Sequence, residues 1–205
     1  MKVLAEIPPP TSPDLRPGSL RRSDLDAYGD LLDELGGARC VMVTGYGSGG
    51  RFAAAGIAAT AAARGSRAVL LECDLAKPAL ADELGLANAP GLHEYLRGDV
   101  EVAAILRPVV LAGPGSGGAT EPLVCVVAGR PAGDGSALLA SQRFHDAIEG
   151  VRAAYEQVVI AAPPLRDEHA LRPLHDAADT TLLCVGPGES RRKPPIPVTG
   201  LVVLN

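Results

Sequence analysis

The sequence contains no tryptophan and few other aromatic residues, with two phenylalanines and four tyrosines among 205 residues. An apolar interior must therefore consist mainly of Ala, Val and Leu, which favours helices packed closely against a sheet. The chain also lacks an excess of basic residues, since its formal net charge is −5. This balance argues against nucleic acid as a main partner.

Long hydrophobic runs are missing as well. No segment approaches the roughly 20 apolar residues that a membrane-spanning helix needs. The apolar start of the sequence is too short for a signal peptide, because prolines 8–10 interrupt it. We therefore expect a cytoplasmic protein.

The four cysteines lie far apart and form no C-x-x-C pair. Three of them stand inside apolar runs typical of strands, and the first opens a fourth such run. Reduced thiols in the core explain this pattern better than disulfides or a zinc site. The residues concerned are Cys40, Cys73, Cys125 and Cys184.

Two parts of the chain differ in composition. Residues 1–22 are rich in Pro, Ser and Arg and show no periodicity, which predicts a flexible N-terminal arm. From residue 23 to residue 205, strand-like and helix-like segments alternate, which predicts one domain. Its expected strands are continuous apolar runs at 40–44, 68–73, 122–129, 157–162, 180–186 and 200–205.

Continuous apolar strands indicate burial on both faces of a sheet. Together with the alternation of strands and helices, they predict an α/β fold of three layers. We expect a doubly wound, mostly parallel sheet with helices on both faces.

The link between the last two expected strands is unusual. Residues 186–199 contain Pro194, Pro195 and Pro197, which oppose a helix in that half of the link. We expect an extended crossing that leaves part of one sheet face uncovered, where a partner or a second copy of the chain would pack.

The stretch "VTGYGSGGRF" resembles a phosphate-binding loop. Gly45 and Gly50 have the G-x-x-x-x-G spacing of a Walker A motif, and Gly47 and Gly49 lie between them. Glycine lets backbone N–H groups approach phosphate closely, and a following helix N-terminus adds partial positive charge. The Lys and the Ser or Thr that complete a Walker A motif are absent, because Arg51 and Phe52 stand there.

Later stretches extend the likeness over nearly the whole chain. They are "AVLLECDLAKPAL", "PGLHEYLRGDVEVAAILRPV", "AGRPAGDGSALLASQRFHDAIEGVRAAYEQVVIAAPPL" and "TGLVVLN". In this order they resemble the cytoplasmic kinase domain of bacterial tyrosine autokinases. These kinases act in capsule and exopolysaccharide assembly and belong to the MinD/ParA class of P-loop ATPases.

The resemblance assigns a role to several positions of this chain. It implies ATP or ADP as the bound nucleotide, held by the loop glycines and Arg51, with Asn205 contacting the adenine. It also implies that Ala161 and Ala162 replace an Asp and a Thr in the Walker B strand. With Phe52 in the Ser/Thr position, both protein groups that usually hold Mg²⁺ are replaced. We therefore do not expect Mg²⁺ to be held in the usual way.

Glu72 and Asp74 open an alternative. They alternate at the end of a strand, so both would point to the carboxyl edge of the sheet. The family uses an acidic pair here for metal and water contacts. Either residue, Asp74 above all, would be the substitute ligand for Mg²⁺ in a slow kinase or ATPase.

Other kinase features are also altered. The family carries a Glu and two Arg, spaced by three, for contacts between subunits; Asp26, Gly29 and Leu32 occupy these positions. The family's tyrosine-rich tail is not found among these 205 residues. The first hypothesis is therefore a regulatory or scaffolding protein that binds a membrane polysaccharide co-polymerase or an active homologue, at the inner face of the membrane. A MinD-like protein that dimerises with nucleotide is a further alternative.

Overall fold

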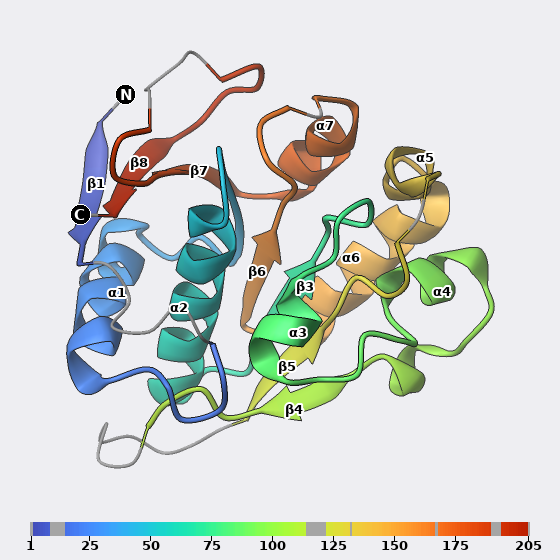
Figure 1. Cartoon of the computed structure of the whole chain (residues 1–205), viewed down its shortest axis with the longest axis horizontal. Coiled ribbons are helices and arrows are strands. Elements are labelled where there is room, and N and C mark those ends of the chain that lie inside the picture. The colour runs from blue at the N-terminus through green and yellow to red at the C-terminus, as the bar shows by residue number, and fades with distance from the viewer. Residues whose placement is uncertain are drawn as a thin grey trace.

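The computed structural model describes residues 2–8, 15–113, 122–131, 133–166, 168–189 and 194–204. They form one eight-stranded sheet in the order β1-β8-β7-β2-β6-β3-β5-β4 (Figure 1). The strands are β1 Val3–Ile7, β2 Cys40–Gly45, β3 Ala68–Glu72, β4 Arg107–Val109, β5 Leu123–Val126, β6 Gln157–Ala161, β7 Thr180–Val185 and β8 Gly200–Leu204.

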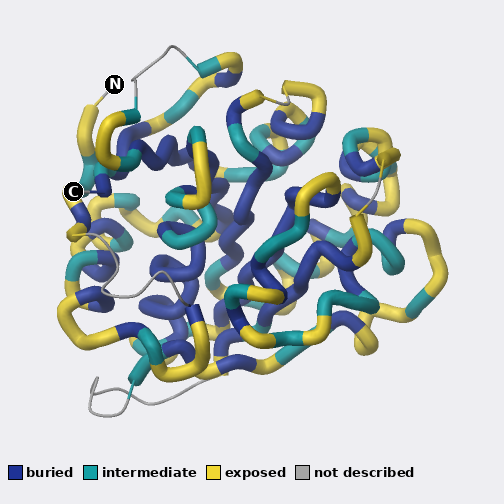
Figure 2. The backbone as a smooth tube through the Cα atoms, in the orientation of Figure 1, coloured by how far each residue is buried: buried dark blue, intermediate teal, exposed yellow. Residues whose placement is uncertain are grey.

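Seven strands run parallel, and only the edge strand β4 pairs antiparallel, with β5. Every residue of the central strands β2, β3 and β7 is buried, as the dark core of Figure 2 shows. Their continuous apolar runs thus reflect burial on both faces. The predicted three-layer α/β fold with a mostly parallel sheet is confirmed.

Two hydrophobic clusters separate the helices by sheet face. The first contains side chains of α1, α2 and α3, and the second contains side chains of α4, α5, α6 and α7. The helices are α1 Arg22–Glu34, α2 Gly49–Ala63, α3 Leu80–Leu84, α4 Leu92–Arg97, α5 Gly135–Leu139, α6 Gln142–Ala154 and α7 Glu168–Ala177, with a 3₁₀ turn at Val102–Ala104. Among the described residues, no helix is long and apolar enough to cross a membrane.

A flexible arm was predicted for residues 1–22. The described residues of this range, 2–8 and 15–22, are instead packed against the domain. Val3–Ile7 forms β1, which pairs in parallel with β8 and brings the two ends of the described chain side by side (Figure 1). Ile7, Leu15 and Leu20 are buried. The prolines begin only after Ile7, so the five residues before them are free to donate and accept along an edge strand.

The link between β7 and β8 contains no helix in its described residues, 186–189 and 194–199, which agrees with the expectation drawn from its prolines. The sheet face beneath it is nevertheless covered in part by the link itself. Ile196 is buried, and Val198 packs against the same cluster as α7. The link thus covers part of the face that was expected to be open.

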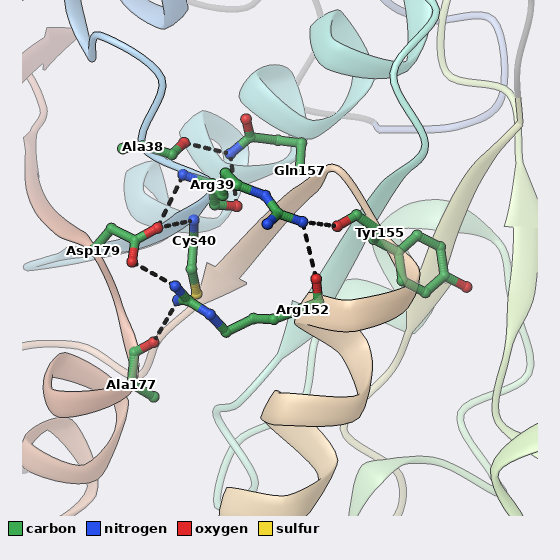
Figure 3. Close-up of polar contacts among 8 residues, drawn as sticks. All are labelled: Ala38, Arg39, Cys40, Arg152, Tyr155, Gln157, Ala177 and Asp179. Atoms are coloured by element: carbon green, nitrogen blue, oxygen red, sulfur yellow. Dashed lines mark hydrogen bonds and ion pairs between the residues drawn. The ribbon is translucent and has the colours of Figure 1, made fainter.

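A polar cluster joins the amino ends of β2, β6 and β7 to the end of α6 (Figure 3). Asp179 accepts the N–H groups of Arg39 and Cys40 through Oδ2, at 2.9 and 2.8 Å. Its Oδ1 lies 2.6 Å from Nη2 of Arg152. Arg39 in turn donates to the carbonyls of Arg152 and Tyr155, both at 3.0 Å. These contacts fix the amino ends of the strands β2 and β7 relative to α6.

All four cysteines are buried and free, as the sequence predicted. Burial raises the pKa of the Cys40 thiol to about 11, with the adjacent Arg152 opposing the shift. The thiols are therefore protonated core groups.

Candidate phosphate-binding site

The glycine-rich loop connects β2 to α2 at the carboxyl edge of the sheet. Two glycines are required by close backbone packing. A Cβ on Gly45 would lie 2.9 Å from the carbonyl oxygen of Cys184, and one on Gly50 would lie 3.0 Å from the carbonyl carbon of Thr44. The loop thus keeps the tight turn into a helix N-terminus that suits an anion.

Gly47 and Gly49 are also crowded. A Cβ on Gly49 would lie 3.0 Å from Cδ1 of Leu204, and one on Gly47 would lie 3.1 Å from Oε1 of Glu189. The predicted loop glycines therefore gather in one compact turn between β7, β8 and the start of α2.

Arg51, in the position of the Walker A lysine, is paired with Glu83 of α3. Its Nη2 lies 2.8 Å from Oε1 of Glu83, and the two side chains are only 16% and 19% exposed. Burial alone would lower the pKa of Arg51, but the hydrogen bond and charge of Glu83, followed by the charges of Glu72 and Asp74, raise it. The guanidinium is fixed as a cation, and its fork is occupied by a protein carboxylate.

Phe52, in the Ser/Thr position, packs against the hydrophobic cluster formed with α1 and α2. A phenyl ring offers no oxygen to a metal ion. Position 52 contributes to the core.

Ala161 and Ala162 fill the Walker B positions with methyl groups and are buried. Their backbone atoms are engaged in the sheet, because Cys73 donates to the carbonyl of Ala161 and Ala162 donates to that of Val43, both at 2.9 Å. The end of β6 thus keeps the backbone geometry of its neighbours without a carboxylate.

Glu72 is completely buried and accepts three backbone N–H groups. Oε1 accepts from Ala79 and Leu80 at 2.8 and 2.7 Å, and Oε2 accepts from Ala128 at 3.0 Å. Burial raises the pKa of Glu72 in spite of these hydrogen bonds and of Arg51 nearby. The carboxylate ties the end of β3 to the start of α3 and to the segment after β5, so both its oxygens already have partners.

Asp74 lies beyond β3 and is 5% exposed. Its Oδ1 accepts the N–H of Lys77 at 3.0 Å. It lines a cavity of about 140 Å³ with residues that include Gly135 and Pro163. Of the predicted acidic pair, Asp74 lines this cavity and Glu72 is not among its lining residues.

Within the described ranges, no group of three or more His, Cys, Asp and Glu side chains has the arrangement to hold a metal ion. Asn205, the predicted adenine contact, lies outside the described residues.

Two residues of the site were missed in the sequence. Glu83 and Glu189 stand 32 and 138 positions after Arg51, and no local motif links them to the loop. The acidic start of the short helix after "KP" was the one available signal for Glu83.

Comparisons with known proteins point to one group. No protein-family model matches the chain. Over 127 residues, 61% of this chain, the sequence is 30% identical to tyrosine-protein kinase Wzc of Salmonella typhi. EpsB of Ralstonia nicotianae is 30% identical over 131 residues. Each match covers 16% of the relative's length, so the chain corresponds to a small part of those proteins.

Over 61–63% of its length the chain is therefore similar to part of bacterial tyrosine-protein kinases. Its fold agrees, because the kinase domain of Escherichia coli tyrosine kinase ETK superposes with a TM-score of 0.81 over 100% of this chain and 90% of that domain, at 18% identity. The septum site-determining protein MinD of Pyrococcus horikoshii, solved with Mg-ADP, superposes with a TM-score of 0.54 over 81% of each chain at 14% identity. The chain therefore has a P-loop NTPase-like fold.

Proposed function

We propose that this chain is a catalytically degenerate homologue of a tyrosine kinase domain. In this role it regulates or scaffolds the assembly and export of a capsular polysaccharide or exopolysaccharide. Its partner would be a membrane polysaccharide co-polymerase or an active kinase homologue, which would place it at the inner face of the membrane. The kinase names of its relatives support the family part of this proposal.

One observation carries the loss of catalysis: the positions that usually hold Mg²⁺ contain no oxygen ligand. Phe52 is a partly buried phenyl ring packed against the core, and the side chain of Ala161 is only a methyl group. Phosphoryl transfer depends on positioning and on stabilisation of developing charge, for which the metal ion is central. Loss of one donor aimed at that charge lowers the rate by about 10²–10³.

Binding of phosphate is a separate matter, because it uses backbone groups. The turn between Gly45 and Gly50 is intact, and α2 begins at Gly49. The MinD protein of similar fold was solved in complex with Mg-ADP. We therefore propose that the chain binds ADP or ATP through the loop backbone, with little dependence on Mg²⁺.

The restored triple variant Arg51→Lys, Phe52→Thr, Ala161→Asp tests this account. It should gain Mg²⁺-dependent ATP turnover over the wild type, while the partial variant Arg51→Lys should not. If the wild type hydrolyses ATP measurably and as fast as the triple variant, the proposal is wrong.

The alternative enzyme would use Asp74 in place of Glu72, since Asp74 lines the cavity at the carboxyl edge. In that case Asp74→Asn would abolish a measurable wild-type ATPase activity. A MinD-like protein would instead dimerise when ATP is added, which sedimentation velocity would detect.

A further inference from the structure

The turn that follows β7 places a carboxylate beside the glycine-rich loop. Glu189 accepts the N–H of Gly186 through Oε2 at 2.8 Å, and its own N–H donates to the carbonyl of Gly186 at 3.2 Å. Gly45 lies opposite Cys184 in the parallel pairing of β2 with β7. The same two strands therefore position both the phosphate loop and this turn.

The carboxylate of Glu189 reaches the loop itself. Its Oε1 lies 3.1 Å from the point that a Cβ of Gly47 would occupy. Its charge also acts on the strand below: burial and, to a smaller extent, Glu189 raise the pKa of the Cys184 thiol to about 12. A negative charge is thus held against a loop whose backbone N–H groups suit an anion.

We propose that Glu189 is an internal competitor of phosphate, which must move away or be neutralised before a phosphate-bearing ligand occupies the loop. Two anions that meet in one site repel each other, and the repulsion weakens binding of the second. The inference rests on the proposed function in one respect, that the loop binds phosphate. It adds a self-inhibited state to that function.

Inorganic pyrophosphate is a suitable probe, because it lacks a base and a sugar that would contact other surfaces. Isothermal titration at low salt in EDTA would compare the wild type with Glu189→Gln. Glu149→Gln is a matched control: it removes the same charge from an exposed position on α6, where the side chain is 71% exposed. We expect about tenfold tighter binding for Glu189→Gln and no change for Glu149→Gln.

Salt provides a second readout. The advantage of Glu189→Gln should shrink as ionic strength rises, since mobile ions screen the repulsion between the two anions. A gain that is independent of salt would point to a change in loop shape and would contradict the proposal.

Three other results would overturn the inference. Equal affinities of wild type and Glu189→Gln would show that the carboxylate does not compete with phosphate, and no binding by either would remove the premise that the loop binds phosphate. Weaker binding by Glu189→Gln when Mg²⁺ replaces EDTA would make Glu189 a metal ligand. Equal, measurable affinities overturn this inference alone, whereas Mg²⁺-dependent ATP turnover by the wild type overturns the proposed function, so the two failures are distinguishable.

Discussion

Glu83 holds the guanidinium of Arg51, with Oε1 2.8 Å from Nη2, at the position where a Walker A lysine would reach for phosphate. The pair also joins α2 to α3 across the first sheet face. Arg is a wide planar donor that prefers two carboxylate contacts to one point contact. Arg51 thus keeps the positive charge of a lysine, but its ion pair with Glu83 links α2 to α3.

Glu83→Gln should therefore weaken the fold and free the arginine. We expect a loss of about 1–3 kcal/mol in the free energy of unfolding, because a mostly buried guanidinium loses its charged partner. Urea denaturation measures this loss. Glu168→Gln is the control, because it breaks an exposed ion pair in which Oε1 of Glu168 lies 3.2 Å from Nη2 of Arg172. This variant should lower the free energy of unfolding by less than about 0.5 kcal/mol. Equal losses in the two variants would argue against a structural role of the Arg51 pair.

The helices α1 and α2 pack closely because Gly56 has no side chain. A Cβ on Gly56 would overlap the ring of Tyr28, whereas one on Gly150 of α6 would meet nothing within 4 Å. Gly56→Ala should lower the free energy of unfolding by about 2–3 kcal/mol, since overpacking displaces the ring. Gly150→Ala should raise it by about 0.5–1 kcal/mol through helix propensity. Thermal denaturation of both variants measures the sign of each change in stability. A stabilised Gly56→Ala variant would contradict this packing.

Asp179 should contribute stability that depends on pH. Burial alone would raise its pKa, but the hydrogen bond from Arg152 and those from Cys40 and Arg39 outweigh it, so the pKa lies below the ordinary value of 3.8. A carboxyl group with a lowered pKa stabilises the fold above its unfolded pKa, and this contribution disappears as the pH falls through the folded pKa.

Asp179→Ala should therefore cost about 2 kcal/mol at pH 7, because two backbone N–H groups lose their acceptor. The difference from wild type should shrink as the pH falls below 3.8. Urea denaturation at several pH values follows the difference. Asp30→Ala, at an exposed position of α1, is the control variant. A cost that does not change with pH would assign the effect to packing alone.

Glu72 should behave as a structural residue. Glu72→Ala removes the acceptor of three backbone N–H groups in a buried place, so we expect a loss of about 3 kcal/mol or more. Glu101→Ala, at an exposed position before the 3₁₀ turn, should stay within about 0.5 kcal/mol of wild type. An unchanged stability of Glu72→Ala would return Glu72 to the candidates for metal binding.

The sequence predicts the centre of the fold better than its edges. The strands β2, β3, β6 and β7 are continuous apolar runs, and runs of this length between turn residues are typical of strands buried on both faces. The edge strands β1 and β4 were missed. β1 contains Glu6 among apolar residues, and β4 is three residues long with Pro108 in it, so neither has the pattern of a buried strand.

The residues of the candidate site also differ in how well the sequence predicts them. The glycines of the loop, Arg51 and Phe52 were identified from spacing, because they occupy fixed positions in a local motif. Ala161 was assigned only through the resemblance to the kinase family. The partners Glu83 and Glu189 come from other elements, and only the packing of α3 and of the turn after β7 brings them to the loop. Glu72 has a position typical of a ligand, but its three backbone donors arrive from distant segments.

The central claim is that the loop kept its affinity for anions while the site lost its ligands for Mg²⁺. Isothermal titration of ATP into the wild-type protein, once with Mg²⁺ and once with EDTA, tests it most directly. We predict binding whose affinity differs by less than about twofold between the two conditions, without hydrolysis during the titration. Binding that requires Mg²⁺, or release of ADP and phosphate, would contradict the claim.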